Sequence, residues 1–411
     1  MGFQSGLSGL NVAAKNLDVI GNNVANAGTV GFKGSRAIFA DVFASSLNGS
    51  GGGQVGIGAK VSKVQQQFTQ GNVSVTNNPL DVAINGGGFF RLSNNGTISY
   101  SRNGQFNLDS SGYIVNSDGL QVTGYPVDSA GNVVPSSPQP LQLSTADVSP
   151  NATTEFDASI NLDSRAASIT LPFSATDPAT YTNSTSGTVY DSLGNPHVMT
   201  LYFSKTATAG QWSLHATLNG GPVTDVNLGA GAGTPVNLNF DNLGRMSTAM
   251  PLNTSITLAN GAVTPLAFEL DFGRTSQFGT DFTVSSLAQN GYAAGRMSGF
   301  SISAEGVIVG RYSNGQALQL GQIVLANFAN PGGLRALGNN QWEETADSGL
   351  ALVGEPLTGS LGSLQSAAVE DSNVDLTQEL VNMITAQRAY QANAQTIKTI
   401  DQVLQTLVNL R

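Results

Sequence analysis

The residues that could carry out catalysis are few, and the two histidines come first. His197 and His215 are the only imidazoles in the chain, whereas serine and aspartate are plentiful. The composition would therefore allow a Ser-His-Asp set. Both histidines fall in expected strands, one after Asn195-Pro196 and the other near Trp212. A histidine on a polar strand is usually an exposed or hydrogen-bonded side chain, so the pattern does not favour a nucleophilic site.

Paired carboxylates give no stronger indication of a hydrolase. Glu269 and Asp271 stand two apart on an expected strand, and Glu343 and Glu344 follow Trp342. Residues two apart share a strand face, and an apolar residue between them belongs to the other face. A solvated sheet face is the simpler explanation than a glycosidase pair.

Motifs for metals and phosphates are incomplete. Asp109 opens an Asp-Ser-Ser-Gly run like part of a calcium loop, but the bidentate glutamate is missing. The glycine-rich run 51–59 precedes Lys60, yet a phosphate loop needs Gly-Lys followed by Ser or Thr. The glycines at 86–88 are typical of a tight turn. We therefore expect no catalytic, cofactor-binding or metal-binding residues, and no enzyme.

The composition excludes further classes of protein. The chain has no cysteine, which leaves no disulfide framework, thiolate nucleophile or zinc knuckle. Its net charge is −10, with 17 basic residues, whereas nucleic-acid binding needs clustered lysine and arginine. The 40% of hydrophobic residues are enough for packed cores, and the length allows two to four domains. The sequence shows neither a cleavable signal peptide nor an apolar run of about 18 residues that would span a membrane.

The elements that must organise the chain begin with a helix at its N-terminus. Apolar residues recur there at alternating steps of four and three, as a heptad stripe requires. Asparagine and glycine from residue 22 onward then favour its end. The stripe comprises Phe3, Leu7, Leu10, Ala14, Leu17, Gly21 and Val24.

A second helix is predicted over residues 375–410. Thirty-six residues make it about 54 Å long, and Ser372 followed by Asp375 is typical of a capping box. Alanines such as Ala386, Ala389 and Ala392 widen its apolar face, which indicates neighbours on several sides. The stripe comprises Leu376, Leu380, Met383, Gln387, Tyr390, Ala394, Ile397, Leu404 and Val408, broadened by Ile384, Ile400 and Leu407.

The long middle of the chain is predicted to be β-rich. Asp-x-x-Gly signals beginning at Asp109, Asp128, Asp191 and Asp241 predict hairpin turns, because aspartate suits the first turn position and glycine supplies a positive φ. Short, evenly spaced strands favour sandwiches or small barrels over βαβ units. Residues 145–284 hold 11 acidic and 4 basic side chains, a net of −7, and prolines cluster around their start. This composition break indicates an inserted domain.

Two striped helices at opposite ends of one chain need something to cover them. They could pair only with each other, or they could pair and then pack against other copies of the chain. The wide apolar face of the second helix favours packing against other copies. Head-to-tail contacts that do not close a ring would then generate a helical filament.

Three sequence blocks resemble the signatures of the bacterial flagellar basal-body rod and hook protein family. They cover about residues 1–125 and 290–411, and one small departure is Val369 before Glu370, where leucine is usual. The first runs from Asn22 to Lys33, the second joins Leu80-Asp81-Val82-Ala83-Ile84 to Gly88-Phe89-Phe90, and the third begins at Ser372-Asn373-Val374-Asp375. The motif residues are Asn22, Asn23, Asn26, Gly31, Phe32, Ser372, Asn373, Asp375, Gln387 and Arg388.

The resemblance implies a multidomain, mainly β chain with helical ends and nested, discontinuous domains. We expect a terminal helical domain of 1–27 with 370–411 and a connecting segment of 28–70 with 350–369. We expect an inner β-domain of 71–144 with 285–349 and an inserted outer β-domain of 145–284. Within the connecting segment, glycines at 49 and 51–53 suggest flexibility, whereas Val61, Val64 and Phe68 suggest a docked strand or arm.

The resemblance also implies a function. The inserted middle makes the chain similar to hook members, which form a flexible curved tube that transmits motor torque from rod to filament as a universal joint. Such a subunit leaves the cell through the flagellar type III export apparatus without a cleaved signal and resides in the hook, adjoining the basal body. Self-assembly would use Phe3, Leu7, Leu10, Leu17, Val24, Leu376, Leu380, Met383, Ile384, Tyr390, Ile397, Leu404 and Leu407.

The implied partners are further copies of the chain, the distal rod, the hook cap, the hook-filament junction protein and the hook-length control protein. We expect no cofactor, no nucleic acid and no membrane insertion. Two alternatives remain: a distal-rod-type protein of the same family, which would be much shorter, and a secreted β-rich adhesin. An adhesin binds a foreign target, whereas a hook subunit mainly binds itself.

Overall fold

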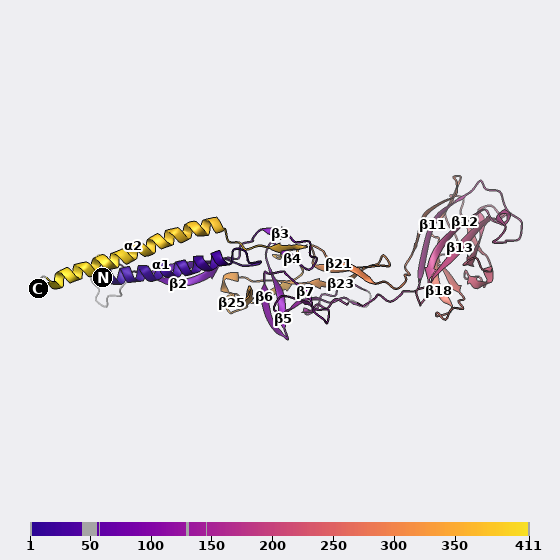
Figure 1. Cartoon of the computed structure of the whole chain (residues 1–411). Helices are drawn as coiled ribbons and strands as arrows, with labels where there is room; N and C mark the ends of the chain where they lie inside the picture. The colour runs from indigo at the N-terminus through magenta and orange to yellow at the C-terminus, as the bar shows by residue number, and fades with distance from the viewer. Residues whose placement is uncertain (1, 43–55, 57, 129–130, 145, 410–411) are drawn as a thin grey trace. The chain divides into compact units, whose positions relative to one another are not determined.

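The computed structural model describes residues 2–42, 56, 58–128, 131–144 and 146–409 (Figure 1). Contacts divide the chain into two compact units. The first consists of Met1–Thr145, Gly299–Gly310 and Ala317–Arg411, and the second of Ala146–Ser298 and Arg311–Gln316. The predicted fold class, mainly β with a helix at each end, is confirmed. Within the described residues, no helix is long and apolar enough to cross a membrane.

Both predicted helices are present in the first unit. α1 spans Gly2–Ala25 and α2 spans Leu376–Asn409, and the two lie side by side (Figure 1). Asp375 caps α2, because its Oδ1 accepts the backbone N–H groups of Thr377 at 2.9 Å and Gln378 at 3.2 Å. The predicted capping box, with Ser372 as the N-cap residue, is therefore wrong. The Ser372 hydroxyl instead accepts from the backbone of Val374.

The segment after α1 forms a hairpin. β1 (Ser35–Val42) pairs antiparallel with β2 (Gly58–Gln66), and the hairpin packs along α1. Val61 and Val64 lie in β2, so the predicted docked strand is confirmed. Phe68 lies just beyond it and packs edge-on against Phe89 and Trp342. The glycines at 49 and 51–53 lie outside the described residues.

Two short antiparallel ribbons connect the helices to the β-structure of the first unit. β3 (Val73–Val75) pairs with β29 (Ala368–Glu370), and β4 (Val82–Asn85) pairs with β28 (Ser363–Ser366). A sheet of thirteen described strands follows, in the main order β21-β22-β23-β9-β5-β6-β26-β25. Its strands are β5 (Phe89–Asn94), β6 (Thr97–Ser101), β7 (Asn107–Leu108), β8 (Ile114–Val115), β9 (Gln121–Tyr125), β10 (Gln139–Pro140), β21 (Met297–Ile302), β22 (Val307–Tyr312), β23 (Ala317–Ile323), β24 (Leu325–Asn327), β25 (Arg335–Gly338), β26 (Gln341–Glu343) and β27 (Leu352–Gly354).

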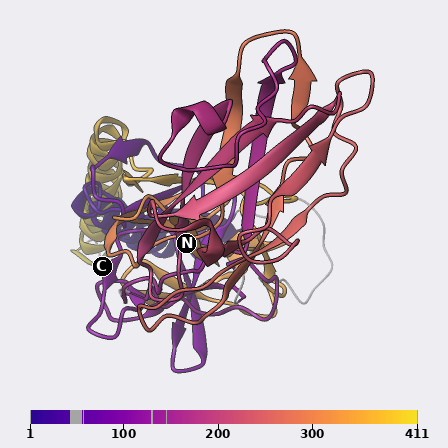
Figure 2. The same cartoon turned by 90° about the vertical axis from the view of Figure 1, so that its right-hand side faces the viewer.

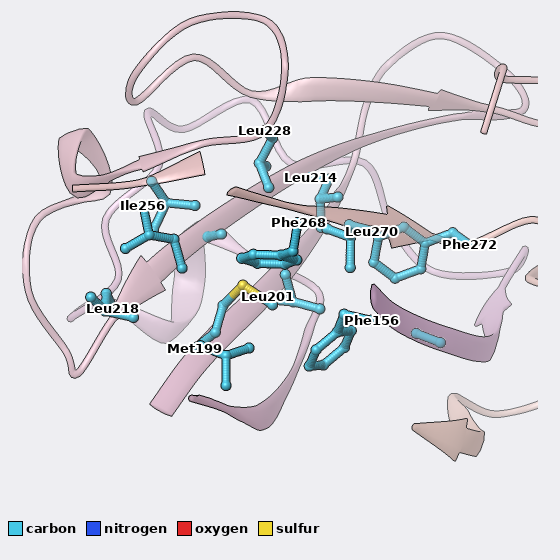
Figure 3. Close-up of a cluster of buried hydrophobic side chains, with 14 of the residues drawn as sticks. Phe156, Met199, Leu201, Leu214, Leu218, Leu228, Ile256, Phe268, Leu270 and Phe272 are labelled. Carbon is cyan, nitrogen blue, oxygen red and sulfur yellow. The ribbon is translucent and has the colours of Figure 1, made fainter. Parts of the chain in front are cut away.

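The second unit is a sandwich of two sheets. One sheet has the order β15-β17-β18-β11-β19, with β20 also on β11, and the other has the order β12-β13-β14-β16. Their inner faces share one core, which includes Phe156, Leu201, Leu214 and Leu270 (Figure 3). Figure 2 shows the long strands of this unit from one side. The strands are β11 (Glu155–Asp163), β12 (Asn183–Tyr190), β13 (Pro196–Lys205), β14 (Gln211–Leu218), β15 (Val226–Asn227), β16 (Val236–Asn239), β17 (Leu252–Ile256), β18 (Leu266–Asp271), β19 (Ser276–Phe278) and β20 (Thr283–Gln289).

The end of the second unit differs from the expected domain boundary. Residue 284 falls inside β20, which pairs antiparallel with β11. The chain then stays with this unit, because Tyr292 bridges Asn151 and Gly295 bridges Val148. These pairings carry the second unit to Ser298.

The predicted Asp-x-x-Gly turns are confirmed. In each, the glycine N–H donates to the aspartate carbonyl at 3.0 Å, for example Gly194 to Asp191. Each of these glycines has a positive φ, between 75° and 83°. The aspartate carboxylate adds local bonds, such as Asp191 Oδ1 accepting from the N–H groups of Leu193 and Asn195. A side chain that closes its own turn explains why this spacing is informative.

Candidate assembly interface of the terminal helices

The first histidine belongs to a structural network. His197 Nε2 lies 2.9 Å from Asp191 Oδ2, and its Nδ1 lies 3.2 Å from Asn219 Nδ2. Asn260 also donates to Asp191. Burial alone would raise the pKa of Asp191, but hydrogen bonds from His197, Asn260 and Asn195 together hold it well below the ordinary value. Asp191 thus stabilises the β12–β13 turn. No serine hydroxyl among the described residues bonds to His197, so the structure shows no Ser-His pair there.

The other candidate catalytic side chains, His215 and Glu269, also have structural explanations. His215 stacks on Phe173 with ring centroids 4.0 Å apart, and burial lowers its pKa. Glu269 is exposed on β18 between the inward side chains of Phe268 and Leu270, as expected for a solvated sheet face.

The carboxylates beside Trp342 have structural partners. Glu343 forms an exposed ion pair with Arg335, and Glu344 accepts from the Tyr100 hydroxyl at 3.3 Å. Burial, with the nearby Glu344 charge, raises the pKa of Tyr100 to about 12. Across the described residues, no group of three or more histidine and carboxylate side chains is placed to hold a metal ion.

The helices pack through their small residues. Gly6, Ala13 and Ile20 are buried on α1, and Ala386 is buried on α2. A Cβ added at Gly6 would lie 3.0 Å from the Ile397 side chain. Small side chains let two helices approach closely, so the intrachain contact is narrow and leaves most of the larger apolar residues incompletely covered.

Several of the larger apolar side chains of both helices therefore remain in contact with water. Six on α2 are between 44% and 54% exposed: Leu376, Leu380, Val381, Ile384, Val403 and Leu404. On α1, Phe3 is 47% and Leu7 is 45% exposed. Many exposed large apolar residues on one helix pair are typical of an interaction surface.

The structure thus divides the residues predicted for self-assembly. The exposed ones are Phe3, Leu7, Leu376, Leu380, Ile384, Tyr390 and Leu404, and the partly buried ones are Leu10, Leu17, Val24, Met383 and Ile397. The side chain of Leu407 lies outside the described residues. We refer to the exposed members, with Val381 and Val403, as the outward face.

Two motif asparagines join the helices to the start of β1. Asn23 accepts from the Ser35 N–H at 2.9 Å and donates to the Ser35 carbonyl at 2.8 Å. Asn373 accepts from the Gly34 N–H at 2.8 Å and donates to the carbonyl of Gln67 at 2.7 Å. Asparagine suits this role because its amide offers both a donor and an acceptor.

The other motif residues support the same junction. Gly31 has φ +70°, and a Cβ there would meet the backbone nitrogen of Asn103 at 2.6 Å. Asn26 Nδ2 donates to the Asn22 carbonyl at 3.0 Å. Phe32 lies beside these residues, and its backbone carbonyl accepts from the Asn373 N–H. On α2, the side chains of Gln387 and Arg388 are exposed.

A buried carboxylate lies at the centre of this junction. Glu370 Oε1 accepts from Lys33 Nζ at 2.7 Å and from the Gly71 N–H at 2.9 Å. Its Oε2 accepts from Arg102 Nη1 at 3.1 Å. The side chains of Lys33 and Glu370 are fully buried and that of Arg102 is 4% exposed. We refer to these three residues as the Glu370 cluster.

The Glu370 cluster is held by further contacts. Lys33 Nζ donates to the Thr69 carbonyl and Arg102 Nη2 to the Gly86 carbonyl, both at 2.8 Å. Burial lowers the pKa of both cations, and the Glu370 charge offsets part of that effect. Sequence reasoning missed Arg102, because its position after β6 gives no signal of a partner 268 residues away.

Comparison with known proteins identifies four family models that match parts of the chain. Residues 3–33 match the model "Flagella basal body rod protein", and residues 83–190 match "Flagellar hook protein FlgE/F/G D1 domain". Residues 161–292 match "Flagellar basal body protein FlaE D2 domain", and residues 365–410 match "Flagellar basal body rod FlgEFG protein C-terminal".

Individual relatives match over their full length. The flagellar hook proteins FlgE of Escherichia coli (strain K12) and Salmonella typhimurium are each 44% identical over 416 residues, covering 100% of both chains. The FlgE of Treponema pallidum is 32% identical, covering 99% of this chain and 98% of its own. The crystal structure of Helicobacter pylori flagellar hook protein FlgE2 has a similar fold, with a TM-score of 0.53 at 15% identity, over 71% of this chain and 99% of that one.

Replacing the central carboxylate tests the Glu370 cluster. Glu370→Gln leaves Lys33 and Arg102 buried without a countercharge, so we expect the first unit to lose about 3–5 kcal/mol of unfolding free energy. Denaturant unfolding followed by Trp342 fluorescence in a Trp212→Phe background measures this loss. The exposed Glu305→Gln serves as the control, and an equal effect of both substitutions would contradict the assigned role.

The Asp191 network predicts a pH dependence of the second unit. The folded pKa of Asp191 is depressed, so its stabilisation is present above the unfolded value of about 3.9 and is lost as pH falls below it. Asp191→Asn should lower stability at pH 7 and flatten the loss of stability below about pH 4. Trp212 fluorescence during denaturation at each pH reports it. With exposed Asp157→Asn as the control, an unchanged acid profile in the Asp191 variant would refute this explanation.

Proposed function

The chain belongs to the flagellar hook protein family and is a structural component of the flagellar hook, and from this premise we propose how it assembles. Copies join through the outward face of α1 and α2 to form a flexible, curved tube. The tube transmits motor torque from the rod to the filament as a universal joint. The full-length similarity to hook proteins, including the second unit, favours the hook over the distal-rod alternative.

The observation that carries this proposal is the exposure of the outward face. Each square ångström of apolar surface removed from water contributes about 25 cal/mol. Within the chain, the narrow contact through Gly6, Ala13 and Ala386 leaves this contribution unused. Identical copies carry the same face, so assembly supplies the missing cover at every position along a polymer.

The domain layout follows from this arrangement. We infer an axial helical layer of 1–27 with 370–411, connected through 28–70 and 350–369 to an inner β-domain. That domain was expected over 71–144 with 285–349, and its second part begins at Gly299. The outer domain, first expected over 145–284, is extended to the second unit, Ala146–Ser298 with Arg311–Gln316. Charged residues are only 11% of the chain, so contacts between outer domains can change with small differences in energy as the tube bends.

The family also suggests the surroundings of this subunit. We infer that it has no catalytic activity and no cofactor, and that it resides in the hook, outside the cell body and adjoining the basal body. It would pass through the flagellar type III export apparatus without a cleaved signal. It would meet the distal rod, the hook cap, the hook-filament junction protein and the hook-length control protein.

Charge placed on the outward face should prevent assembly. In Leu380→Asp with Ile384→Asp, each carboxylate would have to be buried between copies, so we expect no polymer under conditions in which the unmodified chain forms tubes. Sedimentation and electron microscopy of the purified full chain measure the outcome. The control, Gln402→Glu, adds a charge at an exposed polar site of α2. Normal tubes from the double variant would overturn the proposal.

A further inference from the structure

One carboxylate oxygen near the start of α2 has no partner. Oε2 of Glu379 is shielded from solvent and forms no hydrogen bond with any described residue. Oε1 of the same carboxylate accepts only a long bond of 3.4 Å from Asn23. An acceptor withdrawn from water without a partner is unfavourable, so a donor is missing from the isolated chain.

Glu379 borders an open cavity that has room for such a donor. The cavity has a volume of about 570 Å³ and lies between α1, α2 and β1. Its polar lining includes Asn16, Asn23, Asn382 and Thr385. An anionic group in a polar recess of this size matches a cationic side chain with several N–H donors.

The described chain does not supply this cation itself. Lys33 is committed to Glu370. Arg36 borders the cavity but is exposed, whereas its neighbour Ala37 is buried towards the helices. Among the described residues, Arg36 forms no hydrogen bond with the Glu379 carboxylate, whose Oε2 remains without a partner.

Arg388 is the unpaired cation with the complementary position. It lies nine residues after Glu379, and at 100° per residue the two side chains are on opposite faces of α2. It is exposed, forms no ion pair with any described residue, and has no carboxylate three or four residues away on the helix. The two charges therefore cannot meet within one chain.

We propose that Glu379 of one copy receives Arg388 of a neighbouring copy in the polymer. This inference rests on the proposed function and specifies which surfaces of α2 meet. An acid on one face and a base on the other make the contact heterologous, so it repeats from copy to copy without closing a pair. The nine-residue separation sets an offset of about 14 Å between neighbouring α2 helices.

The ion pair would complement the outward face. Apolar contacts are non-directional and allow a helix to slide in steps of one turn. A desolvated charge pair selects one register, because every other register leaves both charges unpaired. Burial of the outward face would then supply the free energy of assembly, and the Glu379–Arg388 pair would set the register between neighbouring helices.

A charge swap in the purified full chain tests the pairing. Glu379→Arg and Arg388→Glu should each raise the critical concentration for polymerisation by about tenfold or more. The double variant, which restores opposite charges with reversed positions, should recover most of that loss. The control Lys398→Glu changes another exposed cation of α2 and should leave the critical concentration nearly unchanged.

Each outcome of the swap decides the inference. If the double variant does not recover, or if neither single variant differs from the control, the pairing is wrong although assembly through the outward face stands. If the unmodified chain forms no polymer, the proposed function itself fails. Circular dichroism of the soluble variants checks that α2 still forms.

Cysteine cross-linking gives a second, independent readout, because the chain has no cysteine of its own. Copies with Glu379→Cys mixed with copies with Arg388→Cys should form a covalent dimer when a short bifunctional thiol reagent is added after polymerisation. The reagent spans the space that the two long side chains occupied, which is too wide for a direct disulfide. Copies with Glu379→Cys mixed with copies with Lys398→Cys should form far less. Equal cross-linking in both mixtures would overturn the pairing.

Discussion

The structure depends on the difference between the narrow contact that joins the two terminal helices and the wider apolar surface that they carry. They meet through glycine and alanine, which permits close packing but covers only a narrow stripe of each helix. Leucine, isoleucine and valine side chains of α2, such as Leu380 and Ile384, stay about half exposed. An apolar surface of this kind is unfavourable in water and favourable between molecules. The same residues that leave the single chain incomplete therefore give it a reason to assemble.

The Glu370 cluster fixes the helices that carry this surface to the β-structure of the first unit. Glu370 lies just before α2 in the sequence, and Lys33 lies just after α1, so one buried carboxylate joins the two ends of the chain. Arg102 adds the β-sheet of the first unit to the same point. Breaking a buried ion pair by removing one partner is costly, which ties the placement of the helices to the β-structure. A force applied to the helical layer would reach the β-domain through this junction.

Local patterns made much of the fold predictable. The heptad spacing from Phe3 to Val24 predicts α1, and the Asp-x-x-Gly turns predict hairpins, because both signals depend on residues close in sequence. Sequence blocks that resemble a known family, such as the asparagine-rich block that begins in the last turn of α1, indicate the functional class.

Other features depend on contacts that periodicity does not encode. The stripe of α2 is wide, so spacing alone did not reveal that Ala386 faces α1 while Leu380 faces water. Arg102 finds Glu370 only after the chain has folded. The cap of α2 was assigned to a box begun by Ser372, whereas Asp375 reaches the free N–H groups itself. In each case the deciding partner is set by tertiary geometry or by competition between adjacent polar residues.

The most direct test of the account is the accessibility of the outward face before and after assembly. A single cysteine at position 380 or 384, in a chain that otherwise has none, can be labelled with a thiol reagent in the monomer and in the polymer. The account predicts rapid labelling in the monomer and strong protection in the polymer. Equally rapid labelling in both states would show that these side chains remain in water after assembly, and would contradict the account.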